Sequence, residues 1–438
     1  MRLKLLSAFA LLLASYPAYV VAANPYWMEE SRSIDVSPSG IERTALRIDP
    51  KDTKAKVWVA HWTQEDASGV WNEEARQLIV KYRLSPLRAS RALTLMHIAM
   101  QDGYARADAA RLNEAGKNAA LHTAASHMLS HLFPLEMPGR LEALGESALS
   151  ALTSSQPKQR VNISRGAEIG HSIAHIAIQR SLGDGADETW DARTRPAPNK
   201  GLWRATPPMD SAHPQEPLAG EWRTWILRHG GEIQPAPPPA FGSGSFLAAA
   251  KEVLEINRNL TAEQKRIAEF WHLDQGTVTP PGLWNIKAGE FSDKNRLSET
   301  ARVNMFAMLN AAMLDASIAS WKAKYTWWTQ RPITVIRENF DASFLPPLVT
   351  PNHPSYVSGH ATVSGAAAEI LKSYFPKDSK QIDAWAEEAA VSRLYGGIHY
   401  RFDNDAGLAL GRRVGLLTVA QMKPVDPKDP VRKKKKSN

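Results

Sequence analysis

Cysteine is absent from the 438-residue chain. This absence excludes disulfide bonds and every metal site built on thiolates. Hydrophobic residues make up 43% of the sequence and charged residues 22%, as in ordinary globular proteins. We therefore expect a long chain that is stabilised by a large hydrophobic core, without covalent cross-links.

Long apolar runs are also scarce. The one at the N-terminus lies in "MRLKLLSAFALLLASYPAYVVAA", where Arg2 and Lys4 precede an apolar stretch at residues 5–14 that is too short to span a bilayer. Small residues follow at Ala22 and Ala23. This pattern is typical of a secretory signal peptide at residues 1–23. It predicts a periplasmic or secreted protein with no transmembrane segment in the mature chain.

Most of the chain's net positive charge lies at its two ends, and the part between them is nearly neutral. The formal charge is +8, of which the tail "PVDPKDPVRKKKKSN" at residues 424–438 contributes +4 and the predicted signal peptide +2, leaving +2 for residues 24–423. So small a charge argues against nucleic acid as a partner. We expect the basic tail to be solvated and disordered.

Alternating strand patterns are nearly absent, apart from a possible short strand in "AKVWVAHW" within an N-terminal extension at residues 24–69. Helical spacing of apolar residues predicts a first bundle half at 70–182 and a second bundle, which carries the functional site, at 247–423. Between them, residues 183–246 are rich in proline and glycine, which predicts a long connection with functional loops. The sequence therefore predicts an all-α fold of two helical-bundle halves in one compact unit.

A faint internal repeat relates the two halves. The stretches "AMQDGYARA" from Ala99 and "AMLDASIAS" from Ala312 share the pattern Ala-Met-x-Asp inside mostly apolar helices. Two packed bundles with a pseudo-repeat would explain this similarity. Chance similarity between alanine-rich helices would explain it nearly as well.

Polar groups are concentrated in "HPSYVSGH", residues 353–360, just before a run with helical apolar spacing. Ser358 and Gly359 stand at the predicted helix start, where a hydroxyl, free backbone N–H groups and the helix dipole favour an anion. A serine at a helix start is commonplace, so this motif alone is weak evidence for an anion-binding site. Further segments of the sequence are needed to support it.

Two further segments supply the chemistry of an oxyanion site. "KYTWWTQRP" contains Lys324 and Arg331, and "SRLYGGIHYRFD" contains Arg393, His399 and Asp403. Guanidinium forks match the paired oxygens of phosphate or vanadate, and an ammonium adds a compact charge. A carboxylate close to a histidine can fix the tautomer of the imidazole. Together with Ser-Gly-His, these residues predict a site for a tetrahedral oxyanion.

The order Lys-x6-Arg-Pro, Ser-Gly-His and Ser-Arg-x5-His-x3-Asp resembles the three-part signature of the vanadium-dependent haloperoxidases and type 2 phosphatidic acid phosphatases. "LTAEQKRIAEFWHLDQGTVTPPGLWNIKAGEF" and "HPSYVSGHATVSGAAAEIL" look like haloperoxidase-type members, and the likeness covers about residues 70–421. In one departure, Val357 stands where the family usually has proline, which loosens the loop but removes no ligand. The resemblance implies the helical-bundle fold of these enzymes.

The resemblance also implies residue roles and a vanadate cofactor, with phosphate able to occupy the same site. His399 would ligate the metal axially with Asp403 behind it, and His360 would be the acid-base group. The equatorial oxygens would be held by Lys324, Arg331, Ser358, Gly359 and Arg393.

Three functions are compatible with this residue set. The favoured one is a haloperoxidase that uses hydrogen peroxide to oxidise a halide to hypohalous acid. The second is an acid phosphatase that cleaves phosphate monoesters through a phosphohistidine on His399, with His360 protonating the leaving alcohol. The third is a catalytically inactive anion-binding protein.

His353 bears on the choice of halide. In the resembling haloperoxidases, bromide-type members tend to carry histidine at this place and chloride-type members an aromatic residue. A second imidazole near His360 can also change the pKa of that residue. We therefore expect bromide or iodide as the halide, the alternative being that His353 only hydrogen-bonds its own loop.

Overall fold

The structure, a computed structural model, describes residues 26–34, 53–63 and 66–425. The predicted signal peptide and nearly all of the basic tail lie outside these residues. Within them the chain forms fourteen α-helices and five short 3-10 helices, and the described part has no β-strand beyond a single bridge between Leu202 and Thr329. The predicted all-α fold class is therefore confirmed.

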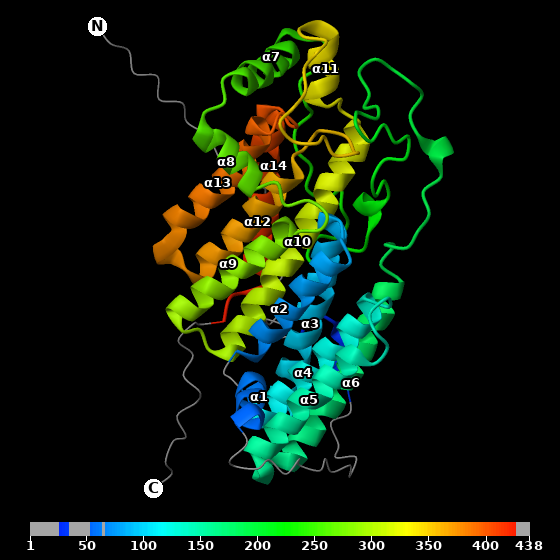
Figure 1. The fold of residues 1–438 in the computed structure, drawn as a ribbon. Helices are drawn as coiled ribbons and strands as arrows, with labels where there is room; N and C mark the ends of the chain where they lie inside the picture. The colour runs from blue at the N-terminus through cyan, green and yellow to red at the C-terminus, as the bar shows by residue number, and fades with distance from the viewer. Residues whose placement is uncertain (1–25, 35–52, 64–65, 426–438) are drawn as a thin grey trace, which may run out of the picture.

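The first six α-helices form the lower body of the molecule in Figure 1, and α3, α4, α5 and α6 pack against one another there. A 3-10 helix, η1 (Glu29–Ser33), precedes them, and another, η2 (Pro157–Gln159), joins α5 to α6. The bounds are α1 (Thr53–Thr63), α2 (Ala67–Lys81), α3 (Pro86–Ala109), α4 (Glu114–Leu132), α5 (Arg140–Ser155) and α6 (Arg160–Leu182).

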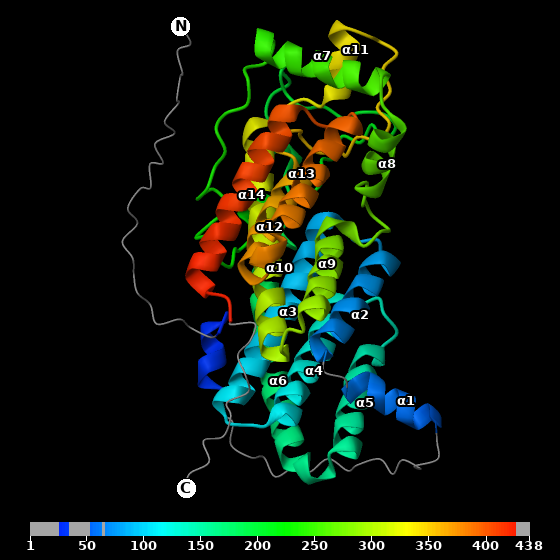
Figure 2. The same cartoon turned by 90° about the vertical axis from the view of Figure 1, so that its left-hand side faces the viewer.

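The remaining eight α-helices build the upper body (Figures 1 and 2), after a connection that contains only η3 (Ala192–Thr194) and η4 (Ala219–Glu221). Their bounds are α7 (Gly244–Arg258), α8 (Ala262–Phe270), α9 (Thr279–Asn295), α10 (Glu299–Trp327), α11 (Pro332–Asn339), α12 (Gly359–Tyr374), α13 (Ser379–Tyr395) and α14 (Arg401–Met422), with η5 (Pro376–Asp378) before α13.

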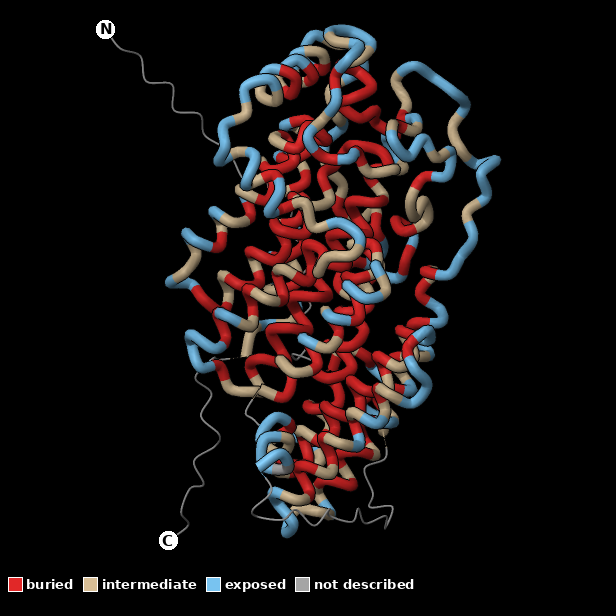
Figure 3. Tube along the Cα trace, in the orientation of Figure 1, coloured by how far each residue is buried: buried red, intermediate tan, exposed pale blue. Residues whose placement is uncertain are grey.

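Helix α10 lies at the centre and belongs to both bodies. It packs against α3 of the lower body and against α12 and α14 of the upper body. Its sequence is apolar on every side, as expected for an interior helix. By length and composition it could cross a membrane, but its apolar stretch is entirely buried inside the molecule. Figure 3 shows this buried interior continuing through both bodies. Core packing therefore explains the hydrophobicity of α10.

The faint sequence repeat corresponds to equivalent contacts in the two bodies. Asp102 of α3 accepts hydrogen bonds from the backbone N–H groups of Trp27 and Met28. Asp315 of α10 accepts from the backbone N–H groups of three consecutive residues, beginning at Trp225. The rings of Trp27 and Trp225 also meet edge to face, with centroids 6.4 Å apart. Each buried aspartate thus holds a separate chain segment against the core.

The possible strand in "AKVWVAHW" is wrong, because these residues lie within helix α1. Trp58 and Trp62 are one helical turn apart, and both pack into the lower core. The buried Trp62 ring also meets His122 of α4 edge to face. Helical spacing of two large apolar side chains, and not β-propensity, thus determines the conformation here.

Candidate functional site

The predicted oxyanion site lies where α10, α11, α12 and α14 begin or end. Ser358 is the N-cap of α12, and its hydroxyl accepts a hydrogen bond from the backbone N–H of Ala361. The backbone N–H of Ser358 donates to the carbonyl of Asp403, so the start of α12 is tied to the start of α14. Gly359 and His360 follow in the first turn and face the cleft described below. The helix start is therefore fixed in place with two of its residues facing a cavity.

Three cations are buried beside this helix start. Lys324, Arg331 and Arg393 are each at most 1% exposed. Asp403 is the buried carboxylate that faces Lys324 and Arg331, so two of the three positive charges lack a buried counter-charge. Burying unpaired charge is costly, and an oxyanion would offset that cost. The charge balance of the site thus favours a bound anion.

Backbone carbonyls orient the first two cations. The Lys324 ammonium donates to the carbonyls of Pro354, Ser355 and Val357, so its three protons are all used and it stands behind the loop. Arg331 donates through Nε to the carbonyl of His353, at 2.8 Å. Val357, which stands where the family usually has proline, accepts one of these hydrogen bonds through its backbone carbonyl. Lys324 contributes charge to the site and also holds the loop in shape.

Arg393 approaches from the other side, at the end of α13. Its Nε donates to the hydroxyl of Ser392 at 2.9 Å, and its side chain lines the cleft. Burial lowers the pKa of Arg393 to about 9 and that of Arg331 to about 10. Both shifts have the same physical cause, because a buried guanidinium without a matching anion is disfavoured in its charged form.

His399 is held in one tautomer. Its Nδ1 lies 2.8 Å from Oδ2 of Asp403, while its Nε2 lies 3.1 Å from Nη1 of Arg331. The same carboxylate oxygen accepts a hydrogen bond from the hydroxyl of Ser355, at 2.5 Å. Because an acceptor faces Nδ1 and a cationic donor faces Nε2, the proton resides on Nδ1. Nε2 therefore presents a lone pair toward the cationic side of the site.

Burial keeps the three histidines of the site neutral. It lowers the pKa values of His353, His360 and His399 well below the ordinary value, and nearby cations lower them further, Arg393 in the case of His360 and Arg331 in the case of His399. Burial also raises the pKa of Asp403 to about 6, against the opposing hydrogen bond from Ser355. A neutral imidazole can act as a ligand, a nucleophile or a proton acceptor.

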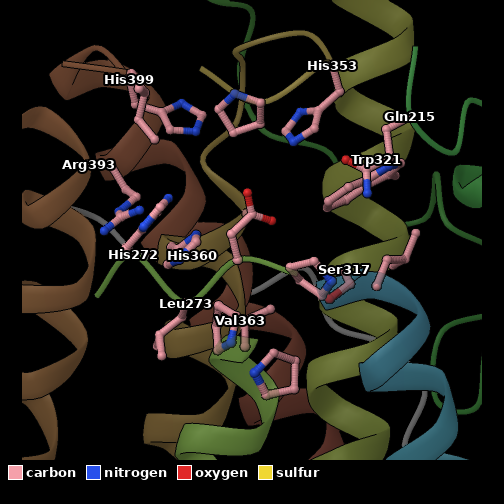
Figure 4. Close-up of a pocket in the computed structure, with 18 of the residues that line it drawn as sticks. Gln215, His272, Leu273, Ser317, Trp321, His353, His360, Val363, Arg393 and His399 are labelled. Atoms are coloured by element: carbon pink, nitrogen blue, oxygen red, sulfur yellow. The ribbon is translucent and has the colours of Figure 1, made fainter. Parts of the chain in front are cut away.

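These residues border a cleft of about 740 Å³, measured with its open mouth included. Of the predicted site residues, those that line it are His353, Gly359, His360, Arg393 and His399. Figure 4 shows His399, Arg393, His272 and His360 on one side of this pocket and Trp321 with Gln215 on the other. Lys324, Arg331, Ser358 and Asp403 stand behind this surface. The structure thus brings all the predicted site residues together. One group lines the cleft, and the other packs directly behind that lining.

Sequence reasoning missed several residues that line the cleft. Trp321 lies one helical turn before Lys324 on α10, and that spacing could have identified it. His272 and Asp274 follow α8 in the segment that carried the family resemblance, and Asp274 acts on the charge of Arg393. Gln215 comes from the connection between the bodies, where no periodic pattern could place it.

Known proteins resemble this chain in its upper body and in its overall fold. Residues 304–384 and 379–425 match the family model described as the VCPO second helical-bundle domain. The described fold is also similar to the crystal structure of a bacterial vanadium-dependent iodoperoxidase, with a TM-score of 0.71 and 25% identity over 83% of this chain and 98% of that one. The chain is thus similar to vanadium haloperoxidases in its upper body and in its overall fold.

Curated haloperoxidases match the chain over shorter stretches. A vanadium-dependent bromoperoxidase of Ascophyllum nodosum is 34% identical over 16% of this chain and 18% of its own length. The vanadium chloroperoxidase of Curvularia inaequalis is 24% identical over 27% of this chain and 23% of its own length. The chain therefore spans less than a quarter of the length of these two vanadium haloperoxidases. The similarity of the folds extends much further than the similarity of the sequences.

Proposed function

We propose that this protein binds vanadate and uses hydrogen peroxide to oxidise bromide or iodide to hypohalous acid. The observation that carries the proposal is the neutral His399, whose Nε2 lone pair faces buried cations while Asp403 holds the proton on Nδ1. A lone pair fixed beside unmatched positive charge suits a tetrahedral oxyanion whose central atom accepts an imidazole ligand.

The donor set fits vanadate. Arg393 and Gly359, the first residue of α12, line the cleft, and Nη1 of Arg331 lies within hydrogen-bond distance of Nε2 of His399. In the proposed complex Arg331, Arg393, Ser358 and Gly359 hold the oxygens, and Lys324 supplies charge from behind the loop. Vanadate, when bound, supplies a Lewis acid that activates peroxide toward the halide.

His360 has the properties of the proton acceptor in this reaction. It lines the cleft, and its Nε2 is buried without a hydrogen-bond partner among the described residues. Its lowered pKa leaves this nitrogen unprotonated at neutral pH, so it can take a proton from entering hydrogen peroxide. His353, which also lines the cleft, hydrogen-bonds Arg331 and makes the halide path polar. This polarity supports the choice of bromide or iodide over chloride.

The N-terminal sequence pattern adds a location to the proposal. Residues 1–23 have the features of a signal peptide, so we place the activity in the periplasm or outside the cell. Peroxide and halide are small and diffuse freely to such a site.

The test is an assay of the purified, metal-free chain with and without added vanadate. We expect bromide or iodide oxidation that requires both vanadate and peroxide. Cleavage of a phosphate monoester that vanadate suppresses would identify the protein as a phosphatase instead, since the His399 lone pair could equally attack phosphorus. Inactivity in both assays, with vanadate bound, would identify an anion-binding protein.

A further inference from the structure

A second cleft lies on the surface beside the end of α10, where residues 195–204 of the connection run past that helix (Figure 1). The space in it that water molecules could occupy is about 620 Å³. This volume lies within the range of ~300–1,000 Å³ that is typical of sites for organic ligands. None of the residues that line this cleft lines the cleft at the oxyanion site, so the two are separate.

The end of α10 holds this part of the connection in place. Leu202 forms the antiparallel bridge with Thr329. The side-chain amide of Gln330 donates a hydrogen bond to the carbonyl of Lys200. A backbone that is fixed before a ligand arrives reduces the free-energy cost of binding. These contacts therefore preorganise the walls of the cleft.

Two tryptophans and an arginine form one part of the lining. Trp203 and Trp328 are both buried, and their ring centroids are 6.2 Å apart. The guanidinium carbon of Arg195 lies 5.4 Å from the ring centroid of Trp203 and 5.8 Å from that of Trp328. Attraction between a cation and the face of an aromatic ring stabilises this position. The two indole rings thus orient the guanidinium.

The positive charge of Arg195 is not matched by a carboxylate of the protein. Its two Nη atoms donate to backbone carbonyls at 3.3 and 3.4 Å, which are long hydrogen bonds. The lining contains no Asp or Glu, and of its three cations only Arg204 forms an ion pair within the described residues, with Glu338. Arg195 and Lys200 therefore bring two positive charges to the cleft without a counter-charge.

We propose that this cleft binds a small aromatic carboxylate. The guanidinium fork of Arg195 matches the two oxygens of a carboxylate, and the ammonium of Lys200 adds a second charge. The ring lies against the apolar part of the lining, which includes Trp328, Pro196 and Pro198. An inorganic anion would leave these apolar groups uncovered, and a neutral aromatic molecule would leave the two cations unmatched. The site goes beyond the proposed function, because its ligand is not a reactant at the oxyanion site.

The first test measures binding of 2-naphthoate to the full chain by isothermal titration calorimetry. We expect one saturable site. Arg195→Gln removes the guanidinium and should weaken binding about tenfold, and Lys200→Gln, at an exposed position, should weaken it about threefold. The matched control is Arg193→Gln, on the same loop and exposed but not among the lining residues, which should bind as the wild type does. No saturable binding, or equal weakening in all three variants, would overturn the proposal.

A comparison of ligands tests whether the cleft recognises both the charge and the ring. 2-Naphthamide has nearly the same shape as 2-naphthoate but no charge, so it should bind the wild type about tenfold more weakly. In Arg195→Gln this preference should shrink, because the group that distinguishes the two ligands is gone. Acetate has the charge but no ring and should show no saturable binding at the same concentrations. Equal affinity for naphthoate and naphthamide, or for naphthoate and acetate, would contradict the assigned ligand class.

A third measurement tests whether 2-naphthoate binds at the oxyanion site instead, where Arg393 lines the other cleft. The titration is repeated with excess inorganic phosphate and with the variant Arg393→Gln, and we expect the affinity for 2-naphthoate to be unchanged in both. Loss of binding on addition of phosphate, or loss in Arg393→Gln while Arg195→Gln binds normally, would place the ligand at the oxyanion site and overturn the proposal. None of these measurements uses peroxide or halide, so their outcome is independent of the proposed function.

Discussion

His399 and Asp403 are joined by a hydrogen bond of 2.8 Å between Nδ1 and Oδ2, across the first turn of α14. Asp403 is fully buried, and its oxygen also accepts from Ser355 and from the backbone N–H of Tyr400. Three donors converge on one carboxylate oxygen, so the carboxylate is fixed and fixes the imidazole in turn.

Asp403→Asn should therefore weaken vanadate binding. The amide oxygen can occupy the same place, but it lacks the charge that makes His399 a better ligand, and affinity should fall by about tenfold to a hundredfold. Equilibrium dialysis with vanadate measures the change. Asp405→Asn, two residues later and exposed, is the matched control and should bind normally. Equal affinities of the two variants would show that Asp403 does not act on the ligand.

Two of the histidines that line the cleft, His399 and His360, should affect vanadate binding and turnover differently when replaced. His399→Ala removes the proposed ligand and should abolish tight vanadate binding. His360→Ala removes only a proton acceptor, so much of the binding should remain while turnover falls by about a hundredfold or more. Binding and steady-state halide oxidation are compared for both variants, with His175→Ala as an exposed control in the lower body. Equal loss of binding in both would contradict this division of roles.

His353 should affect the choice of halide. Its Nδ1 lies 3.0 Å from Nη2 of Arg331, and its ring packs against Trp321 at 5.2 Å. His353→Phe makes the path less polar and should raise the rate with chloride relative to that with bromide. His353→Asn keeps a polar partner for Arg331 and serves as the control. A halide profile unchanged in both variants would leave His353 with a purely structural role.

Asp102 should make stability depend on pH. Burial raises the pKa of Asp102 from 3.8 to about 7 in the folded state, so the stabilisation from this group is complete below pH 3.8 and is lost as the pH rises toward 7. Asp102→Asn lacks this dependence. The difference in free energy of unfolding between wild type and variant should therefore be greater at pH 4.5 than at pH 7.5.

Urea denaturation at several pH values measures that difference. Asp108→Asn, on the exposed side of the same helix, should unfold with the wild-type pH dependence. If the gap between wild type and Asp102→Asn were the same at all pH values, Asp102 would not change its protonation in this range.

Much of the fold could be predicted from the sequence because its helices are long and periodic. Interior helices such as α10 show an apolar surface on every side, and serine caps such as Ser298 and Ser358 mark where helices begin. The prediction failed at α1, where Val57, Trp58 and Val59 suggest a strand. Packing of Trp58 and Trp62 into the lower core overrides that local preference.

The oxyanion site could also be predicted, because its residues lie in three compact motifs with fixed spacing. The far wall of the cleft could not be predicted from the sequence. Leu87 and Gln215 are distant in sequence from those motifs, and only the packing of the two bodies brings them to the same cavity. The position of Lys324 behind the loop that precedes α12 could not be predicted either. The sequence does not show that its ammonium donates to the carbonyls of Pro354 and Ser355.

Titration of the metal-free protein with vanadate, with halide oxidation measured at each addition, tests the central claim most directly. The account predicts no bromide or iodide oxidation at the start, a rate that rises in proportion to added vanadate, and a break at one equivalent per chain. Inorganic phosphate should compete with vanadate for the same site. Oxidation before any vanadate is added, or vanadate bound at one equivalent with no oxidation of either halide, would contradict it.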